Sequence, residues 1–138
     1  MAGMDLLPIS EVAAGFRLPI STLHYWERCG LLTPHRRSGR RCYDRDQLYR
    51  IALLKVWRET GNLSLDDIAA ALGVRDTDRG WRDTVSARIE AIEAETRRLE
   101  TARSYLTYLL TCRHHGAPDE CPYFREGVQL PAVSGSMS

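Results

Sequence analysis

The 138-residue sequence predicts a mainly α fold, with a winged helix-turn-helix in its first half and a long coiled-coil helix after it. Two observations predict this fold. Before residue 75, short apolar stripes with helical spacing are separated by Gly and Pro. The segment Trp81–His115 then runs without Gly or Pro. Its residues in a 4,3,4,3 rhythm are mostly apolar, which indicates a helix with a seam for a partner.

The first two helices are short and lie close together in the sequence. Apolar residues at helical spacing predict a helix over Ile9–Phe16 with Ser10 as its N-cap. Pro19 disfavours helix in the residue before it and therefore ends this first helix. A second helix is expected from about Ser21 to Cys29, with Gly30 as its stop signal. Two short helices joined by a tight turn form a helix-turn-helix.

A small β-wing and two further helices are expected next. Ser38-Gly39 is a hairpin turn signal within the segment 36–43. Asp44 or Asp46 is positioned to cap a longer helix that Gly61 stops. Ser64 with Asp67 is a variant of the capping box, and it begins a helix that ends at Gly73.

The second half of the chain is expected to carry the dimer interface. The heptad seam consists of Val85, Ile89, Ile92, Thr96, Leu99, Arg103, Leu106 and Leu110, with Thr96 and Arg103 as polar interruptions. This seam favours a two-chain coiled coil over a helix that lies on its own domain's core, because no other helix in the sequence has a matching length. The expected divisions are a DNA-binding domain at 1–74, a linker at 75–80, a coiled-coil helix at 81–111, a Cys/His loop at 112–127 and a disordered tail at 128–138.

Charge is divided unevenly along the chain, although the formal net charge is only +1. Residues 17–58 contain ten basic and three acidic side chains, so this window carries 10 − 3 = +7. Residues 61–138 contain nine arginines and twelve acids, which gives 9 − 12 = −3. This asymmetry indicates that only the first half meets a polyanion.

Composition also bounds the compartment and the class of protein. The start of the chain lacks the pattern of a signal peptide, and no apolar run reaches the roughly 18 residues that a membrane span needs. We therefore expect a cytoplasmic protein with no membrane partner, whose four cysteines are thiols, ligands or core residues. The motifs of common nucleotide-binding and hydrolytic sites are absent from the sequence, so we expect no enzymatic activity.

The residues from Leu23 to Pro34 (LHYWERCGLLTP), followed by Arg36–Tyr43 (RRSGRRCY), resemble the signature of the MerR family of bacterial transcription regulators. The segment Leu63–Ala69 (LSLDDIA) is similar to the family's next helix. The resemblance implies a homodimer with an antiparallel coiled coil. It also implies a regulator that bends and untwists the spacer between promoter elements, so that RNA polymerase engages both of them.

Residue chemistry and the resemblance together indicate the DNA contacts. Hydroxyl groups at a helix start hold phosphate, guanidinium groups reach phosphates, and side chains further along the helix meet base edges. The expected contacts lie in the second helix and in the wing: Ser21, Thr22, His24, Tyr25, Arg28, Arg36, Arg37, Arg40, Arg41 and Tyr43. Trp26 is expected in the core, Cys29 and Cys42 as packing residues, and Lys55 and Arg58 as possible flanking phosphate contacts.

A segment with two cysteines and two histidines follows the predicted coiled coil. Its candidate ligands are Cys112, His114, His115 and Cys121. Two thiolates with imidazoles suit zinc, and two thiolates alone suit copper(I) or mercury(II). The resemblance implies an effector site in this place. An organic ligand, a redox response, or a coiled-coil interaction protein without DNA affinity are the alternatives.

Overall fold

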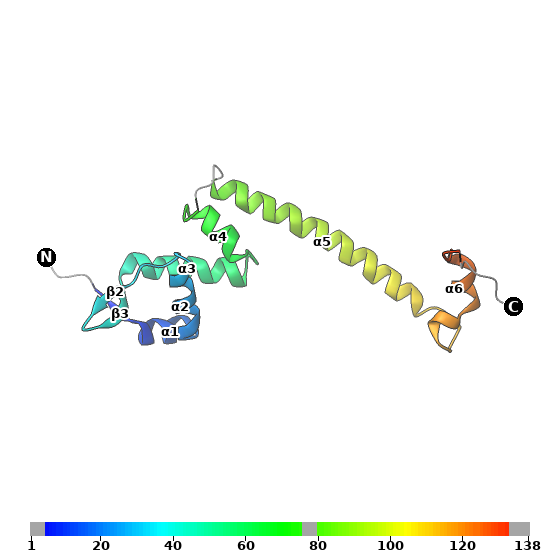
Figure 1. The fold of residues 1–138 in the computed structure, drawn as a ribbon, viewed down its shortest axis with the longest axis horizontal. Coiled ribbons are helices and arrows are strands. Elements are labelled where there is room, and N and C mark those ends of the chain that lie inside the picture. The colour runs from blue at the N-terminus through cyan, green and yellow to red at the C-terminus, as the bar shows by residue number, and fades with distance from the viewer. Residues whose placement is uncertain (1–4, 76–79, 133–138) are drawn as a thin grey trace. The chain divides into compact units, whose positions relative to one another are not determined.

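The computed structural model describes residues 5–75 and 80–132 (Figure 1). These residues divide into two units, with the boundary between Ile92 and Glu93. The boundary between the units falls within a helix, and the predicted functional divisions remain a prediction. Residues 76–79 of the predicted linker and 133–138 of the predicted disordered tail lie outside the described residues.

Helices α1 (Ile9–Phe16) and α2 (Ile20–Arg28) form the helix-turn-helix. The prediction that Ser10 caps α1 is wrong, because the extended Pro8 precedes the first helical residue and Ser10 lies inside the helix. Arg17 ends α1 in the left-handed region at φ 57°, and Pro19 precedes α2. The turn between the two helices therefore takes only three residues, Arg17–Pro19.

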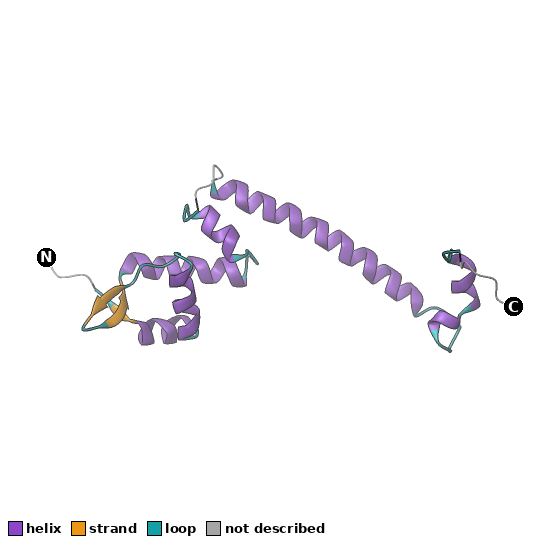
Figure 2. Cartoon of the chain, in the orientation of Figure 1, coloured by secondary structure: helices purple, strands orange, loops and turns teal. Residues whose placement is uncertain are grey.

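The wing is a three-stranded antiparallel sheet with the order β1-β3-β2 (Figure 2). Strands β2 (His35–Arg37) and β3 (Arg40–Tyr43) form the predicted hairpin, and β1 (Leu7–Pro8) adds an edge that the sequence did not indicate. The turn residues Ser38 and Gly39 have φ values of 54° and 76°. Two consecutive positive φ values are the geometry of a two-residue hairpin turn with the right-handed twist of its strands.

Two capped helices follow the wing in the first unit. The Asp44 carboxylate accepts the backbone N–H of Gln47 at 2.9 Å and begins α3 (Arg45–Glu59), which selects Asp44 from the two predicted caps. This hydrogen bond and the neighbouring His35 lower the pKa of Asp44. The predicted capping box of Ser64 and Asp67 is confirmed, with both of its hydrogen bonds, at the start of α4 (Leu65–Ala71).

The hydrophobic core lies between the helix-turn-helix, the sheet and helices α3 and α4. Trp26 is a core residue, as predicted, with 4% of its surface exposed. Cys42 is buried and Cys29 packs against the core, which confirms their prediction as packing residues. The largest fully buried side chains come from every layer of this unit: Tyr43, Leu23, Leu31, Ile51, Leu54, Ile68 and Val12.

Helix α5 (Trp81–Leu109) is the long predicted helix. Its seam is open to solvent in the single chain, since Ile89, Leu99 and Leu106 each expose about half of their surface. The short helices η1 (Pro118–Glu120) and α6 (Pro122–Gly127) follow it. Across the described ranges, none of the helices combines the length and apolar character that a bilayer crossing needs.

Candidate nucleic-acid interface

Helix α2 presents a polar stripe on one side and buries the other. Leu23 and Trp26 face the core. Ser21, Tyr25 and Arg28 are exposed at the i, i+4, i+7 spacing of one helical face. The Arg28 guanidinium lies over the Tyr25 ring, 5.6 Å from its centroid. The two residues, both predicted to contact DNA, therefore hold each other in place through a cation–π interaction.

The first turn of α2 is open to an anion. Its N-cap residue, Pro19, supplies no side-chain hydrogen bond to the first backbone N–H groups, although its carbonyl oxygen accepts the Thr22 N–H at 3.0 Å. Ser21 is exposed and Thr22 is half-buried within this turn. Unsatisfied N–H groups at a helix start, together with the helix dipole, favour phosphate.

The wing concentrates four arginines on two rungs of one hairpin. Arg36 pairs with Arg41, and Arg37 pairs with Arg40. Like charges directly opposite each other destabilise a strand pair, so this arrangement favours binding of an anion. Arg37 and Arg40 are exposed, and Arg41 alone of the four has a carboxylate partner within the part of the chain that the structure describes.

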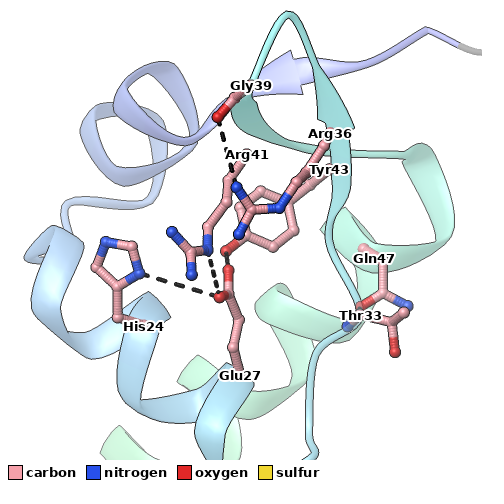
Figure 3. Close-up of polar contacts among 8 residues, drawn as sticks. All are labelled: His24, Glu27, Thr33, Arg36, Gly39, Arg41, Tyr43 and Gln47. Carbon is pink, nitrogen blue, oxygen red and sulfur yellow. Dashed lines mark hydrogen bonds and ion pairs between the residues drawn. The ribbon is translucent and has the colours of Figure 1, made fainter.

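The carboxylate of Glu27 joins α2 to the wing (Figure 3). Glu27 Oε2 accepts a hydrogen bond from Arg41 Nε at 2.7 Å, and Oε1 accepts one from the Tyr43 hydroxyl. His24 Nδ1 lies 3.9 Å from Oε2. Arg41 and Tyr43 reach the same carboxylate because residues two apart on a strand point to the same face.

Tyr43 is placed in the core. The ring is fully buried, and this burial, together with the hydrogen bond to Glu27, raises the pKa of the Tyr43 phenol. Its hydroxyl is therefore committed to Glu27 in the DNA-free chain. The prediction that Tyr43 itself contacts DNA stays a prediction, and its observed contacts are those of a residue that positions the wing.

Contacts at the base of the wing fix it to α3. His35 Nε2 lies 2.6 Å from Asp44 Oδ2, and the Thr33 N–H donates to Gln47 Oε1 at 2.8 Å. Both contacts hold the wing strand and the loop before it against the start of α3.

The two basic residues predicted as flanking contacts are engaged inside the fold. Lys55 Nζ donates to the Phe16 carbonyl oxygen, and the Arg58 guanidinium donates to the Leu63 carbonyl oxygen at 2.9 Å. Both cations hold backbone segments together, at the end of α1 and before α4. Their role as phosphate contacts stays a prediction.

Residues 7–73, which span the sheet and helices α1 to α4, match the family model described as MerR HTH family regulatory protein. This chain carries a MerR-family helix-turn-helix domain. It is 30% identical over 105 residues to the nodulation protein NolA of Bradyrhizobium sp. (strain NC92), which covers 75% of this chain and 43% of that protein. It is 28% identical over 123 residues to the HTH-type transcriptional regulator HmrR of Rhizobium leguminosarum bv. viciae, covering 86% of this chain and 95% of HmrR.

The likeness of fold to a solved structure extends beyond the matched segment. The crystal structure of the transcription regulator PbrR691 from Ralstonia metallidurans CH34, in complex with lead(II), superposes with a TM-score of 0.67 at 24% identity. The match covers 88% of this chain and 99% of PbrR691, which shows a shared fold. This chain spans less than half the length of several curated relatives that it matches, NolA included.

The predicted metal ligands of this chain lie around the segment between α5 and α6. Cys112 and His115 are exposed, His114 is half-buried with Nε2 3.2 Å from the Ala117 carbonyl oxygen, and Cys121 is buried immediately before α6. Within residues 5–75 and 80–132, no three His, Cys, Asp or Glu side chains gather as a metal site requires. The donor types suit a thiophilic metal, but one chain does not bring them together as a complete site.

Glu27 is the interface residue that the sequence did not single out. It is the only acidic residue between Arg17 and Tyr43, and this isolation in a basic segment was the available signal. Its partners Arg41 and Tyr43 are 14 and 16 residues away. The packing of the wing against α2 decides this contact, and no local sequence pattern records it.

Proposed function

We propose that this protein is a transcription regulator of the MerR family that binds promoter DNA as a homodimer in the cytoplasm. The observation that carries the proposal is the pair of cross-strand arginine rungs attached, through Glu27, to the exposed stripe of α2. A helix fits the major groove, while arginines on an adjoining hairpin reach the flanking phosphates. Helix α2 therefore supplies the contacts to the bases, and the wing, which is held to it, supplies the contacts to the DNA phosphates.

The dimer in this proposal forms through α5. Apolar residues repeat along its seam, and in the single chain Leu99 and Leu106 expose 54% and 58% of their surface. A helix with a solvent-exposed heptad seam gains stability when a second helix covers it. Two chains joined in this way present two copies of α2 to a duplex with two-fold symmetry.

The regulatory step of the proposal is distortion of the duplex. The bound dimer bends and untwists the spacer between promoter elements, so that RNA polymerase engages both of them. Bending a site of this size costs on the order of a few kcal/mol, which contacts from two wings offset. An effector would therefore switch transcription by changing how strongly the bound dimer distorts the spacer.

The binding test starts from a random pool of duplexes. The expected result is enrichment of an inverted repeat, bound by two protein chains and shortened end to end when both duplex ends carry fluorophores for energy transfer. Failure to enrich any duplex at low ionic strength contradicts DNA binding. Enrichment of a duplex that stays straight when bound contradicts only the distortion step and leaves DNA binding in place.

A thiophilic metal ion is the effector that we propose to test first. The support is the presence of Cys112, His114, His115 and Cys121 around one short segment, and a metal is also the ligand of PbrR691, whose fold this chain shares. In this proposal these residues would hold zinc, copper or mercury, with the missing donors coming from the second chain of the dimer. The metal would supply the cross-link that these thiolates and imidazoles cannot make alone.

Elemental analysis of the dimer, purified without added metal, tests this effector class. The expected result is about one metal ion per chain, lost in Cys112→Ser and retained in the packing variant Cys29→Ser. A dimer without metal, which also takes up none of the three ions on titration, contradicts it. Release of DNA by an organic cation or by an oxidant would then favour the alternative effectors.

A further inference from the structure

The carboxylate of Glu27 lies where the two DNA-facing elements meet. Its side chain is only 10% exposed, and it receives Arg41 and Tyr43 from β3 while His24 lies 3.9 Å away on its own helix (Figure 3). A carboxylate next to a DNA surface repels phosphate, so its presence there has an electrostatic cost for binding. Its position is explained if the residues that it holds in place contribute more to the binding free energy than the repulsion costs.

The bond between Glu27 and Arg41 leaves most of the guanidinium available. It uses Arg41 Nε, and the terminal nitrogens have no hydrogen-bond partner among the residues described. The Arg41 side chain is 35% exposed, so those terminal groups are open to solvent on the wing. A guanidinium fork held at Nε presents its remaining N–H groups in a fixed plane, which suits bidentate binding of a phosphate.

We propose that Glu27 is a positioning residue for DNA binding: it fixes the Arg41 fork toward phosphate and aligns the wing with the exposed stripe of α2. The inference rests on the proposed function. An arginine side chain loses rotamer freedom when it binds, and prior immobilisation removes that loss from the binding step. The hydrogen bond from buried Tyr43 holds the carboxylate itself, so the chain Tyr43–Glu27–Arg41 runs from the core to the surface.

The two roles of a carboxylate at this place predict opposite results for Glu27→Gln. This variant keeps the shape of the side chain and removes one negative charge. It also replaces one accepting oxygen with an amide NH2 donor, so it cannot accept hydrogen bonds from both Arg41 and Tyr43. If Glu27 only repels DNA, the variant binds more tightly. If Glu27 positions Arg41, the variant binds more weakly, on the order of tenfold for a dimer that must order one arginine in each subunit.

The experiment is a double-mutant cycle, measured on the duplex that the wild-type protein enriches from a random pool. We expect Glu27→Gln to cost little in an Arg41→Ala background, because the group that it positions is gone. In an Arg37→Ala background, used as the matched control, the losses of DNA affinity caused by Glu27→Gln and by Arg37→Ala should multiply. Glu27→Gln should also flatten the salt dependence as Arg41→Ala does, by about 0.9 in slope for each lost phosphate contact.

Arg41→Lys provides a second variant that leaves Glu27 untouched. It keeps the positive charge but replaces the planar fork with a compact ammonium group, so we expect most of the loss seen with Arg41→Ala. A mere folding defect would lower the fraction of active protein and leave the salt slope unchanged.

The inference is overturned by equal or tighter binding of Glu27→Gln, by full affinity of Arg41→Lys, or by losses at Glu27 and Arg41 that multiply. It stands if both variants bind more weakly and the cycle is non-additive. A wild-type protein that enriches no duplex overturns the proposed function, and this inference with it. If the wild-type protein binds DNA but the Glu27 and Arg41 losses are additive in free energy, only this inference is overturned and the proposed function remains.

Discussion

Replacement of Tyr43 by Phe removes the hydroxyl that donates a hydrogen bond to Glu27, between the wing and α2. The ring keeps its buried position, and Glu27 Oε1 loses the donor that satisfies it in a side chain only 10% exposed. A hydrogen bond to a charged group contributes about 1.5–3 kcal/mol, so we expect Tyr43→Phe to lower the free energy of unfolding by that amount at pH 7. For a unit of this size, that corresponds to a thermal midpoint lower by roughly 10 °C.

The pH dependence gives this prediction a sign that can be checked. Burial and the Glu27 contact raise the pKa of Tyr43 above its ordinary value of about 10, so its contribution is complete below that pH. As the pH rises above about 10, the unfolded chain ionises first and the wild type loses this contribution, whereas Tyr43→Phe has no phenol to ionise. The stability difference between the two proteins should therefore shrink in alkaline solution.

Thermal unfolding followed by circular dichroism, at one protein concentration because the dimer couples association to stability, measures both effects. Equal stability of the two proteins at pH 7, or a difference that stays constant from neutral to alkaline pH, would refute the reasoning. Unchanged stability with a selective loss of DNA affinity would instead assign Tyr43 to direct contact.

Three further results are expected. Arg37→Ala should weaken binding to all duplexes alike and flatten the salt slope by about 0.9 for each subunit, while Arg97→Ala on α5 should change neither quantity in a fluorescence titration. Leu99→Asp should weaken dimerisation by about 3–6 kcal/mol, since each of two leucines loses about 1.5–3 kcal/mol of burial. Sedimentation should show a monomer for this variant and a dimer for the exposed control Thr101→Asp. Asp44→Asn should remove part of the loss of stability below about pH 4: the lowered pKa of Asp44 makes its contribution present above that pH and lost as the folded carboxylate protonates. An acid transition identical to that of the wild type would contradict this assignment.

The order of elements was predictable because local rules agree with the packing in this chain. Gly and Pro mark most of the helix ends, and the Ser64–Asp67 capping box appears as its spacing requires. Ser38-Gly39 forms the expected turn, since both residues tolerate the positive φ that a two-residue hairpin needs. Such features depend on neighbours within four residues, so the sequence alone determines them.

Features that depend on tertiary packing were not predictable in the same way. Strand β1 has two residues, too few for a periodic pattern, and it forms only because β3 offers an edge. Tyr43 is predicted as a DNA contact, and neither the burial of its ring nor its hydrogen bond to Glu27 has a local sequence signal. Lys55 is predicted as a flanking phosphate contact, and its hydrogen bond to the Phe16 carbonyl oxygen, 39 residues away, has no local sequence signal. Each of these contacts joins segments far apart in the sequence.

The most direct test of a DNA-binding dimer with arginine wings is the salt dependence of its affinity for the enriched duplex. If at least two wing arginines of each subunit contact phosphate, four counterions are released and the logarithm of the association constant falls with a slope of about −3.6 or steeper. A slope near zero would contradict the account, because a complex without phosphate contacts cannot use the two arginine rungs of the wing.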